Sequence, residues 1–328
     1  MARPANAVTL ILVLAGKGSD AIVAGGLAAF AAFSAAEHLG KVGVGAGMIP
    51  ITPTAAFPSP FLSATWIPGF LNRASHRLVN AVLWRAFRRR TNAARVLFGL
   101  PPRDTVWSDV PMLYGVSRHL LPRPDDWPAS VDLSGQWLMP TPEWNPPPAL
   151  MRFLAEGDKP IYIGFGSMAG FDRSRMFDAL VKGLAGRRAL ISPGWSGVDA
   201  TGLPENFFVI GDTPHDWLFP RVAAVIHHGG SGTSHSAARA GVPSIVVPFA
   251  GDQFFWAERL RLVGVAPAPV DGRRPTGVAF ARALNLVAAP SIRARAEALG
   301  TAMRAERGVA NATDSLEHIL AVRRSSPR

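Results

Sequence analysis

The residues with the clearest chemical potential lie in the segment His227-His228-Gly229-Gly230-Ser231-Gly232-Thr233. The apolar run 222–226 precedes it, and the sequence predicts a helix from Ser234 to Ala240 after it. Glycines let a backbone approach a ligand closely, hydroxyls donate hydrogen bonds, and a helix start offers unpaired N–H groups and a positive dipole end. The combination suits a diphosphate, and a helix cap with glycines for tight packing is the alternative.

A second polar pair, Asp252-Gln253, follows the apolar run 243–248. A carboxylate accepts hydrogen bonds and a side-chain amide both donates and accepts, so the pair suits the vicinal hydroxyls of a sugar. The alternative is that Asp252 caps a helix. The aromatic residues 254–256 are expected to pack in a core or between domains rather than to stack on a ligand.

The turn Gly164-Phe165-Gly166-Ser167-Met168-Ala169 fits the dinucleotide pattern G-x-G-x-x-G/A. That pattern needs an acidic residue at the end of the next strand for the ribose, and the corresponding strand here ends Leu190-Ile191-Ser192. A nicotinamide cofactor is therefore a weak alternative, and we expect no cofactor. A tight turn that presents Ser167 beside the neighbouring diphosphate segment explains these residues more simply.

Other kinds of catalytic site are disfavoured. Esterases with a His-Gly-Gly loop need a Gly-x-Ser-x-Gly nucleophile elbow, which the sequence lacks. It also lacks an Asp-x-Asp to hold a divalent cation, and His227, His228 and His235 have no acidic or thiolate partner nearby for zinc. We therefore predict no metal, and expect the helix dipole, amides and His228 to stabilise a leaving diphosphate.

The elements that must position these residues form a regular alternation in the second half of the chain. Short apolar runs without polar alternation are separated by helical patterns, which indicates a parallel sheet covered on both faces. We predict a doubly wound α/β domain, in which ligands bind at the carboxyl ends of the strands. The predicted strands are 160–164, 189–192, 207–210, 222–226 and 243–248.

A proline-dense stretch, 140–148, cannot continue a helix or a central strand and is predicted to be an interdomain linker. It separates an N-terminal domain, 1–139, from a C-terminal domain, 149–328, that includes the C-terminal helices. Near the N-terminus, a buried strand followed by a Gly/Ala-rich helix explains the apolar runs Val8–Ala15 and Ala21–Ala36. No stretch is long and apolar enough to predict a transmembrane helix.

Composition agrees with two ordinary domains: the chain has 328 residues, of which 48% are apolar, and no cysteine. The net charge of +11 indicates anionic surroundings. Much of this charge lies on a predicted helix around the basic segment Arg85–Arg95. A solvated helix face explains the segment most simply, and a surface facing lipid headgroups is the sharper alternative. No nucleic-acid-binding signature accompanies the charge.

Several short blocks of the sequence, taken together, resemble those of a known family. The sequence resembles the UDP-glycosyltransferase superfamily, in the branch of sterol 3β-glucosyltransferases and bacterial antibiotic and glycolipid transferases. Several blocks match in order and at fixed spacing, which is more specific than any single glycine loop. The matching blocks are 164–168, 214–220, 227–233, 240–243 and 247–253, with looser similarity at 52–60.

The resemblance implies the GT-B architecture, with an activated sugar on the C-terminal Rossmann-like domain and the acceptor on the N-terminal one. Both domains are doubly wound α/β units, and the N-terminal one is expected to be incomplete here. The family's uracil-stacking tryptophan corresponds to Ile210, so Trp195 and Ile210 are the candidates for the base site, with packing as the alternative for Trp195. By position, the diphosphate contacts are Ser167, His228, Gly230, Ser231, Gly232 and Thr233, and the sugar contacts are Asp252 and Gln253.

The family's opening loop, which supplies the catalytic base, has no counterpart in the sequence. The segment Asp20–Gly26 resembles a strand well inside the usual N-terminal domain, so the catalytic base is unassigned. Asp20, Glu37 and His38 are available acids or bases, but no spacing argument selects one of them.

The resemblance implies inverting, metal-independent transfer of a hexose from a UDP-sugar or related nucleotide sugar to a hydroxyl of a lipid-like or natural-product acceptor. The alternatives are a truncated, non-catalytic nucleotide-sugar-binding remnant or accessory subunit, and a basic membrane- or nucleic-acid-binding module. We expect a cytoplasmic protein without a nucleic-acid partner. Peripheral contact at the inner membrane through Arg85–Arg95 is the alternative to a solvated face for that segment.

Overall fold

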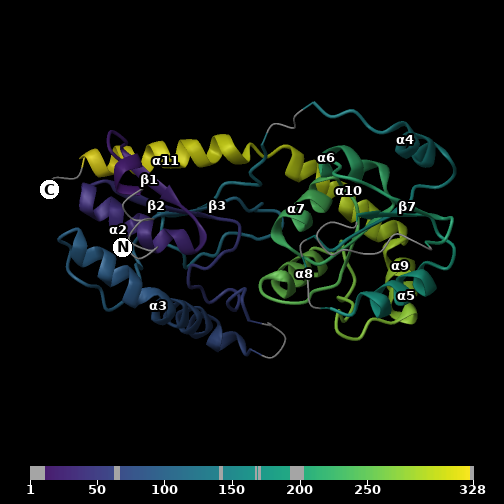
Figure 1. Cartoon of the computed structure of the whole chain (residues 1–328), viewed down its shortest axis with the longest axis horizontal. Helices are drawn as coiled ribbons and strands as arrows, with labels where there is room; N and C mark the ends of the chain where they lie inside the picture. Colours follow the sequence, from purple (N-terminus) through teal and green to yellow (C-terminus); the bar gives the residue numbers. More distant parts are fainter. Residues whose placement is uncertain are drawn as a thin grey trace. The chain divides into compact units, whose positions relative to one another are not determined.

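A computed structural model describes residues 12–62, 67–139, 143–166, 168, 171–192 and 203–325. The chain divides into two compact units, each built on a parallel sheet with helices. The first unit comprises Met1–Arg118, Pro122–Trp137 and Arg307–Arg328, and the second comprises His119–Leu121 and Leu138–Glu306. Figure 1 shows the elements of both units in the colours of the sequence.

The sheet of the first unit has four parallel strands in the order β1-β2-β3-β4. Helix α2 packs on it through small residues, and Ala32, Ala35 and Ala36 share a core cluster with Ile22 of β1. Small side chains allow the helix to approach the sheet closely. The strands are β1 (Ala21–Ala24), β2 (Val42–Gly47), β3 (Met112–Tyr114) and β4 (Val131–Leu133), and the helical segments are η1 (Gly26–Ala28), α2 (Ala29–Leu39), η3 (Gly69–Leu71), α3 (Asn72–Leu97) and α11 (Gly308–Ser325).

Two expectations for the first unit need correction. Residues 12–15, the described part of the expected strand Val8–Ala15, are helical. The run Ala21–Ala36 begins as strand β1, as expected for Asp20–Gly26, and its helix starts only at Ala29. A Gly-rich turn around Gly25 and Gly26, the latter at φ +58°, separates the two elements and ends the strand.

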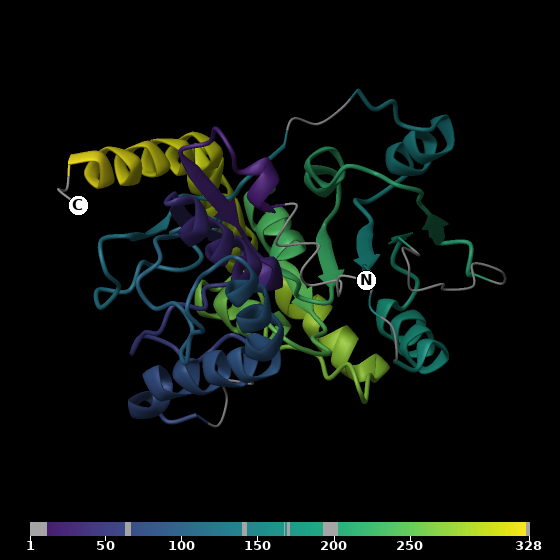
Figure 2. The same cartoon turned by 60° about the vertical axis from the view of Figure 1, so that its left-hand side comes forward.

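The C-terminal helix belongs to the first unit, so the expected domain 149–328 is wrong at its C-terminal end. Asn311 donates its side-chain amide to the Ser134 carbonyl at 3.0 Å, and the Ser315 hydroxyl donates to Asp132 at 2.8 Å. In two views α11, drawn in yellow, lies beside the purple strands of this unit (Figure 1, Figure 2). Contacts with residues far away in sequence decide where this helix packs.

The sheet of the second unit has five parallel strands in the order β7-β6-β5-β8-β9 and is covered on both faces, as predicted. Successive residues of β5 enter different cores: Ile161 and Ile163 pack with α5 and α9, whereas Tyr162 packs with Leu218 and Phe219 on the other face. The strands are β5 (Ile161–Gly164), β6 (Ala189–Ser192), β7 (Phe207–Val209), β8 (Ala224–His227) and β9 (Ser244–Val246).

Among the described residues, helices follow β5, β7, β8 and β9, as in a doubly wound domain. Helix α4 begins at Pro148, at the end of the predicted linker, where proline suits the first helical position. The helical segments are α4 (Pro148–Ala155), α5 (Arg173–Leu184), α6 (His215–Leu218), η5 (Phe219–Arg221), α7 (Ser231–Arg239), α8 (Gln253–Leu262), α9 (Gly277–Val287) and α10 (Pro290–Arg304). None of the helices in the described ranges has both the length and the apolar character that crossing a membrane requires.

Helices α5 and α9 lie side by side (Figure 1) and touch through glycine. A Cβ at Gly183 would lie 2.4 Å from the Phe280 Cβ and 3.0 Å from the Gly277 carbonyl oxygen. We expect Gly183→Ala to lower the free energy of unfolding by about 1–3 kcal/mol, because the added methyl overpacks this contact. Urea denaturation measures the change.

Gly211→Ala is the matched control, because a Cβ at Gly211 meets nothing within 4 Å and its backbone is not left-handed. It should change the free energy of unfolding by less than about 0.5 kcal/mol. Equal stability of the two variants would contradict the close α5–α9 packing.

Candidate functional site

Three loops of the second unit converge at the carboxyl edge of its sheet. Register places Gly164 of β5 opposite both Ser192 of β6 and His227 of β8. The loops after β5 and β9 touch through a 3.1 Å contact from the Gln253 side-chain nitrogen to the Met168 sulfur. The structure therefore brings the predicted diphosphate and sugar segments together at one edge.

Helix α7 starts at Ser231, three residues earlier than predicted. Gly230 is its N-cap, and the first backbone N–H bond within the helix runs from Ser234 to the Gly230 carbonyl at 3.0 Å. Ser231, Gly232 and Thr233 thus occupy the first turn, where the helix itself supplies no acceptor for the N–H groups of Gly232 and Thr233. This arrangement strengthens the predicted anion site, because the three residues lie at the positive end of the helix dipole.

The His228 imidazole packs between two glycines. A Cβ at Gly230 would lie 2.5 Å from His228 Nε2, and a Cβ at Gly166 would lie 3.2 Å from His228 Cε1. Gly166 also has φ +57°, which favours glycine on its own account. Two loops thereby hold the ring, and burial lowers its pKa, so His228 is neutral at pH 7.

His227 is fully buried beneath this segment. Its Nδ1 accepts a hydrogen bond from the Gly229 N–H at 3.1 Å, which assigns the proton of the neutral ring to Nε2. Burial lowers the pKa of His227 to about 3, with a smaller contribution from His228 and His215. His227 therefore supports the loop and cannot be the cation that meets a diphosphate.

A pair behind the site, the buried Tyr162 and the half-buried His215, was not predicted. The Tyr162 hydroxyl lies 3.4 Å from Nε2 of His215, whose ring stacks on Phe219 with centroids 4.2 Å apart. Burial lowers the pKa of His215 and raises that of Tyr162. The only sequence signal was the position of His215 in a block that matches the family.

Asp252 lies directly before α8, at the N-cap position, but its side chain makes no capping bond. Its Oδ2 accepts from Nε1 of Trp256 at 2.9 Å, one helical turn away. Burial raises the pKa of Asp252, and the bond from Trp256 opposes that rise. Trp256 is buried, as expected, and also orients the carboxylate, a role that its i, i+4 spacing could have suggested.

Gln253 is tied into the loop after β9. Its side-chain oxygen accepts from the N–H groups of Phe249, at 2.7 Å, and Ala250, at 3.2 Å. A Cβ at Gly229 would lie 2.9 Å from the Gln253 carbonyl oxygen, so the loops after β8 and β9 are in contact. Gln253 holds this loop through its oxygen, and its side-chain nitrogen contacts the Met168 sulfur, so its role toward sugar hydroxyls stays a prediction.

The two candidates for binding the nucleobase of the donor, Trp195 and Ile210, have different outcomes. Ile210 is buried in the core cluster with Leu150 and Tyr162, so it offers no face on which a base could stack. Ile210 directly follows the edge strand β7, and packing against Leu150 encloses it in the core, which the alignment of motifs alone did not reveal. Trp195 and Ser167 lie outside the described residues.

The acids and bases considered for proton removal lie at the amino edge of the first sheet. Asp20 directly precedes β1 and pairs with Arg324 at 2.9 Å, and α2 returns Glu37 and His38 to the start of β2. Burial of Glu37 opposes ionisation, but hydrogen bonds from Arg95 and Trp107 prevail and lower its pKa. Ligands of doubly wound sheets bind at the opposite edge, so none of these three is favoured as the base.

No group of three or more histidine, aspartate or glutamate side chains is arranged to hold a metal ion in the described part of the chain. Two of the three histidines weighed for zinc have other partners: His227 Nδ1 accepts from the Gly229 N–H, and His235 Nδ1 donates to the Ser231 carbonyl at 2.8 Å.

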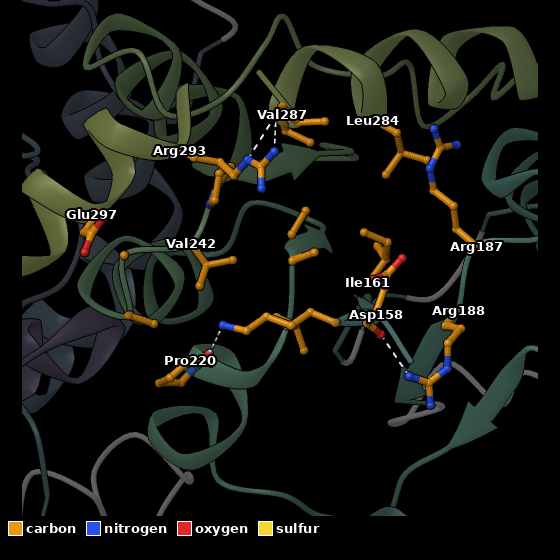
Figure 3. Close-up of a pocket in the computed structure, with 18 of the residues that line it drawn as sticks. Asp158, Ile161, Arg187, Arg188, Pro220, Val242, Leu284, Val287, Arg293 and Glu297 are labelled. Atoms are coloured by element: carbon orange, nitrogen blue, oxygen red, sulfur yellow. Dashed lines mark hydrogen bonds between the residues drawn. The ribbon is translucent and has the colours of Figure 1, made fainter. Parts of the chain in front are cut away.

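A cavity of about 1180 Å³ lies at the amino edge of the second sheet, away from the converging loops. Figure 3 shows Arg187, Arg188 and Arg293 around it. These arginines donate to backbone carbonyls or an amide oxygen: Arg188 to Asp158 at 2.9 Å, Arg293 to Ala288 at 2.7 Å and Arg187 to the Asn285 side chain at 3.1 Å. Size alone therefore does not mark the site, and the chemistry lies at the carboxyl edge.

Two fully buried histidines should make the stability of the protein sensitive to acid. Burial lowers the pKa of His227 to about 3 and that of His235 to about 4. Unfolding restores a pKa near 6.5, so the unfolded chain binds more protons below that pH and stability falls as the pH drops. Lowering the pH from 6.5 to 5 should reduce the free energy of unfolding by about 2 kcal/mol for each ring. Urea denaturation at the two pH values measures this change.

His235→Gln should remove its share of this pH dependence, whereas His318→Gln, at an exposed position of α11, should keep the pH dependence of the parent. A parent protein with equal stability at pH 7 and pH 5 would show that these rings are not buried in the neutral form.

Comparison with known proteins agrees with this geometry. A family model described as "Erythromycin biosynthesis protein CIII-like, C-terminal domain" matches residues 190–318. The chain is 36% identical to a sterol 3-beta-glucosyltransferase of Arabidopsis thaliana over 80% of the chain and 43% of that protein. It is 34% identical to an O-mycaminosyltylonolide 6-deoxyallosyltransferase of Streptomyces fradiae over 86% of the chain and 74% of that protein.

Solved glycosyltransferases share the fold. The kitacinnamycin glycosyltransferase superposes with a TM-score of 0.71 at 20% identity, covering 96% of this chain and 80% of that one. VinC in complex with dTDP gives 0.64 at 18% identity (96% and 76%), and an anthocyanidin 3-O-glucosyltransferase in complex with UDP gives 0.63 at 15% (97% and 78%). The chain spans less than half the length of the two plant sterol glucosyltransferases that it matches. With its two parallel-sheet units and these relatives, the chain belongs to the GT-B glycosyltransferases, in the family of sterol 3-beta-glucosyltransferases and antibiotic glycosyltransferases.

Proposed function

We propose that the protein transfers a hexose from a nucleoside diphosphate sugar, UDP-linked or dTDP-linked, to a hydroxyl group of a lipid-like or natural-product acceptor. The observation that carries the proposal is the convergence of the α7 N-terminus, His228 and Asp252 at one sheet edge. Relatives named as a sterol 3-beta-glucosyltransferase and an O-mycaminosyltylonolide 6-deoxyallosyltransferase support this acceptor class, and solved neighbours in complex with UDP or dTDP support the donor class.

In the proposed reaction an acceptor oxygen attacks the anomeric carbon of the donor sugar. The carbon–oxygen bond to the diphosphate breaks with inversion, the nucleoside diphosphate leaves, and the acceptor proton passes to a base. The N–H groups of Gly232 and Thr233, at the start of α7, stabilise the negative charge that develops on the leaving oxygens. Because burial keeps His228 neutral, it contributes as a hydrogen-bond donor and not as a counter-charge.

The sugar would be held on the other side of the same edge. Asp252 uses one carboxylate oxygen for Trp256, and the second can accept from a sugar hydroxyl. Gln253 would add its side-chain N–H group, since its oxygen already accepts from two backbone amides. The fixed carboxylate of Asp252 favours hexoses that carry a hydroxyl opposite it over sugars that lack this hydroxyl. Without the hydroxyl, a partly buried carboxylate oxygen has no hydrogen-bond donor.

Metal-independent transfer follows from this arrangement if fixed amide dipoles balance the diphosphate. The alternative of a non-catalytic remnant or accessory subunit gains no support from the comparisons, whose named relatives are transferases.

Substitutions should separate diphosphate binding from sugar binding. His228→Ala should weaken the binding of both UDP and UDP-glucose about 10-fold or more, because it removes a hydrogen bond to a charged group. Calorimetry measures the two affinities. Asp252→Asn should weaken the binding of UDP-glucose by a similar factor and leave the affinity for UDP unchanged.

Asp178→Asn, at an exposed position of α5, is the matched control and should bind both ligands like the parent. If the parent binds dTDP-glucose in place of UDP-glucose, the same comparison is made with the dTDP pair. The proposal fails if a folded parent protein binds neither nucleotide sugar, or if Asp252→Asn weakens the free nucleotide as much as the sugar nucleotide.

A further inference from the structure

Helix α3 of the first unit exposes apolar side chains along one face. Leu78, Val82 and Val96 have 61%, 59% and 60% of their surface exposed, and Leu71, just before the helix, has 42%. Spacings of seven, four and three or four residues keep side chains on one face of a helix, so Leu71, Leu78, Val82, Arg85, Arg89 and Val96 form one stripe. Phe70 extends the apolar end and is 85% exposed.

The opposite face of α3 already has its partners, so the stripe is the outer face of the helix. Trp84 is 4% exposed and donates its indole N–H to the Asp104 carbonyl at 2.8 Å. Arg95 is 2% exposed and pairs with Glu37 of α2 at 2.7 Å. Phe87 stacks on Phe30, which also belongs to α2. Nothing in these contacts requires apolar residues on the outer face.

The charged side chains of α3 are all positive. Its sequence has no aspartate or glutamate. Arg73 and Arg95 pair with carboxylates from other elements, whereas Arg77, Arg85, Arg88, Arg89 and Arg90 form no ion pair among the described residues. Arginines at i, i+4, such as Arg85 and Arg89, repel each other and destabilise an isolated helix. An anionic surface would relieve this repulsion.

The two features together select one kind of partner. A solvated face or a nucleic acid accounts for the arginines but not for Phe70, Leu78 and Val82. A second copy of the chain accounts for the apolar stripe but would bring two unneutralised arginine clusters together. A bilayer with anionic lipids accounts for both, because apolar side chains enter the interface while arginines contact headgroups.

We propose that the outer face of α3, from Phe70 to Arg90, docks the protein on the surface of a membrane that contains anionic lipids. The helix lies in the plane of the interface and does not cross it. The proposal is independent of the donor site, since it uses no residue of the second unit.

Flotation of the full chain with lipid vesicles tests this proposal. The parent protein should float with phosphatidylcholine–phosphatidylglycerol vesicles, float much less with phosphatidylcholine alone, and be released by salt. The triple variant Arg85→Gln, Arg88→Gln, Arg89→Gln should bind about 100-fold more weakly, since each arginine near an anionic surface contributes roughly fivefold. The double variant Leu78→Ser, Val82→Ser should also bind more weakly.

Matched controls come from exposed positions of the second unit. Arg273→Gln, Arg274→Gln, Arg282→Gln removes the same charge, and Val278→Ser, Leu286→Ser removes similar apolar side chains. Both should float like the parent. Circular dichroism and thermal unfolding verify that each variant is folded, which is expected because every substituted side chain is exposed.

The proposal is overturned if the parent does not float with anionic vesicles, or if the unit-two arginine variant loses as much binding as the α3 variant. It is also overturned if light scattering shows that the parent dimerises through Leu78 and Val82 without binding vesicles. UDP-glucose affinity, measured on the same samples, reports separately on the donor site.

Discussion

The packing of one imidazole between two turns is the constraint on which the candidate site depends. His228 fits only because neither Gly166 nor Gly230 has a side chain, and the ring thereby ties the loop after β5 to the start of α7. Gly229 brings the same segment against Gln253, so the loop after β9 joins as well. Three loops from distant parts of the sequence become one rigid edge, and amides that must meet a diphosphate need that rigidity, because electrostatic stabilisation requires dipoles already in place.

The histidines of this edge are neutral, which determines the kind of electrostatics that the site can use. Burial lowers the pKa of His227, His228 and His235 alike. A diphosphate would therefore meet helix amides and neutral N–H donors instead of a cluster of cations. The positive charge of the chain lies elsewhere, much of it on α3, where exposed arginines accompany exposed apolar residues. Nucleotide recognition and surface attachment would thus use separate residues and can be altered separately.

The sequence by itself determined the second unit and its site to a large extent. The runs that form β5 to β9, their parallel arrangement and the placement of His228, Ser231 and Asp252 at the carboxyl edge follow from local patterns, because strand and helix periodicity and glycine-rich turns depend on neighbouring residues. The family resemblance rests on the same local blocks, and the comparisons confirm it.

Only the tertiary structure decided features that depend on long-range contacts. The sequence could not show that α11 packs on the first unit through Ser134, that Ile210 is enclosed in the core, or that the Gln253 oxygen is already bound by backbone amides. It also could not separate the arginines of α3 that pair with carboxylates from those that remain exposed. In each case the residue type allows several partners, and the partner is chosen by chain segments that are distant in sequence and adjacent only after folding.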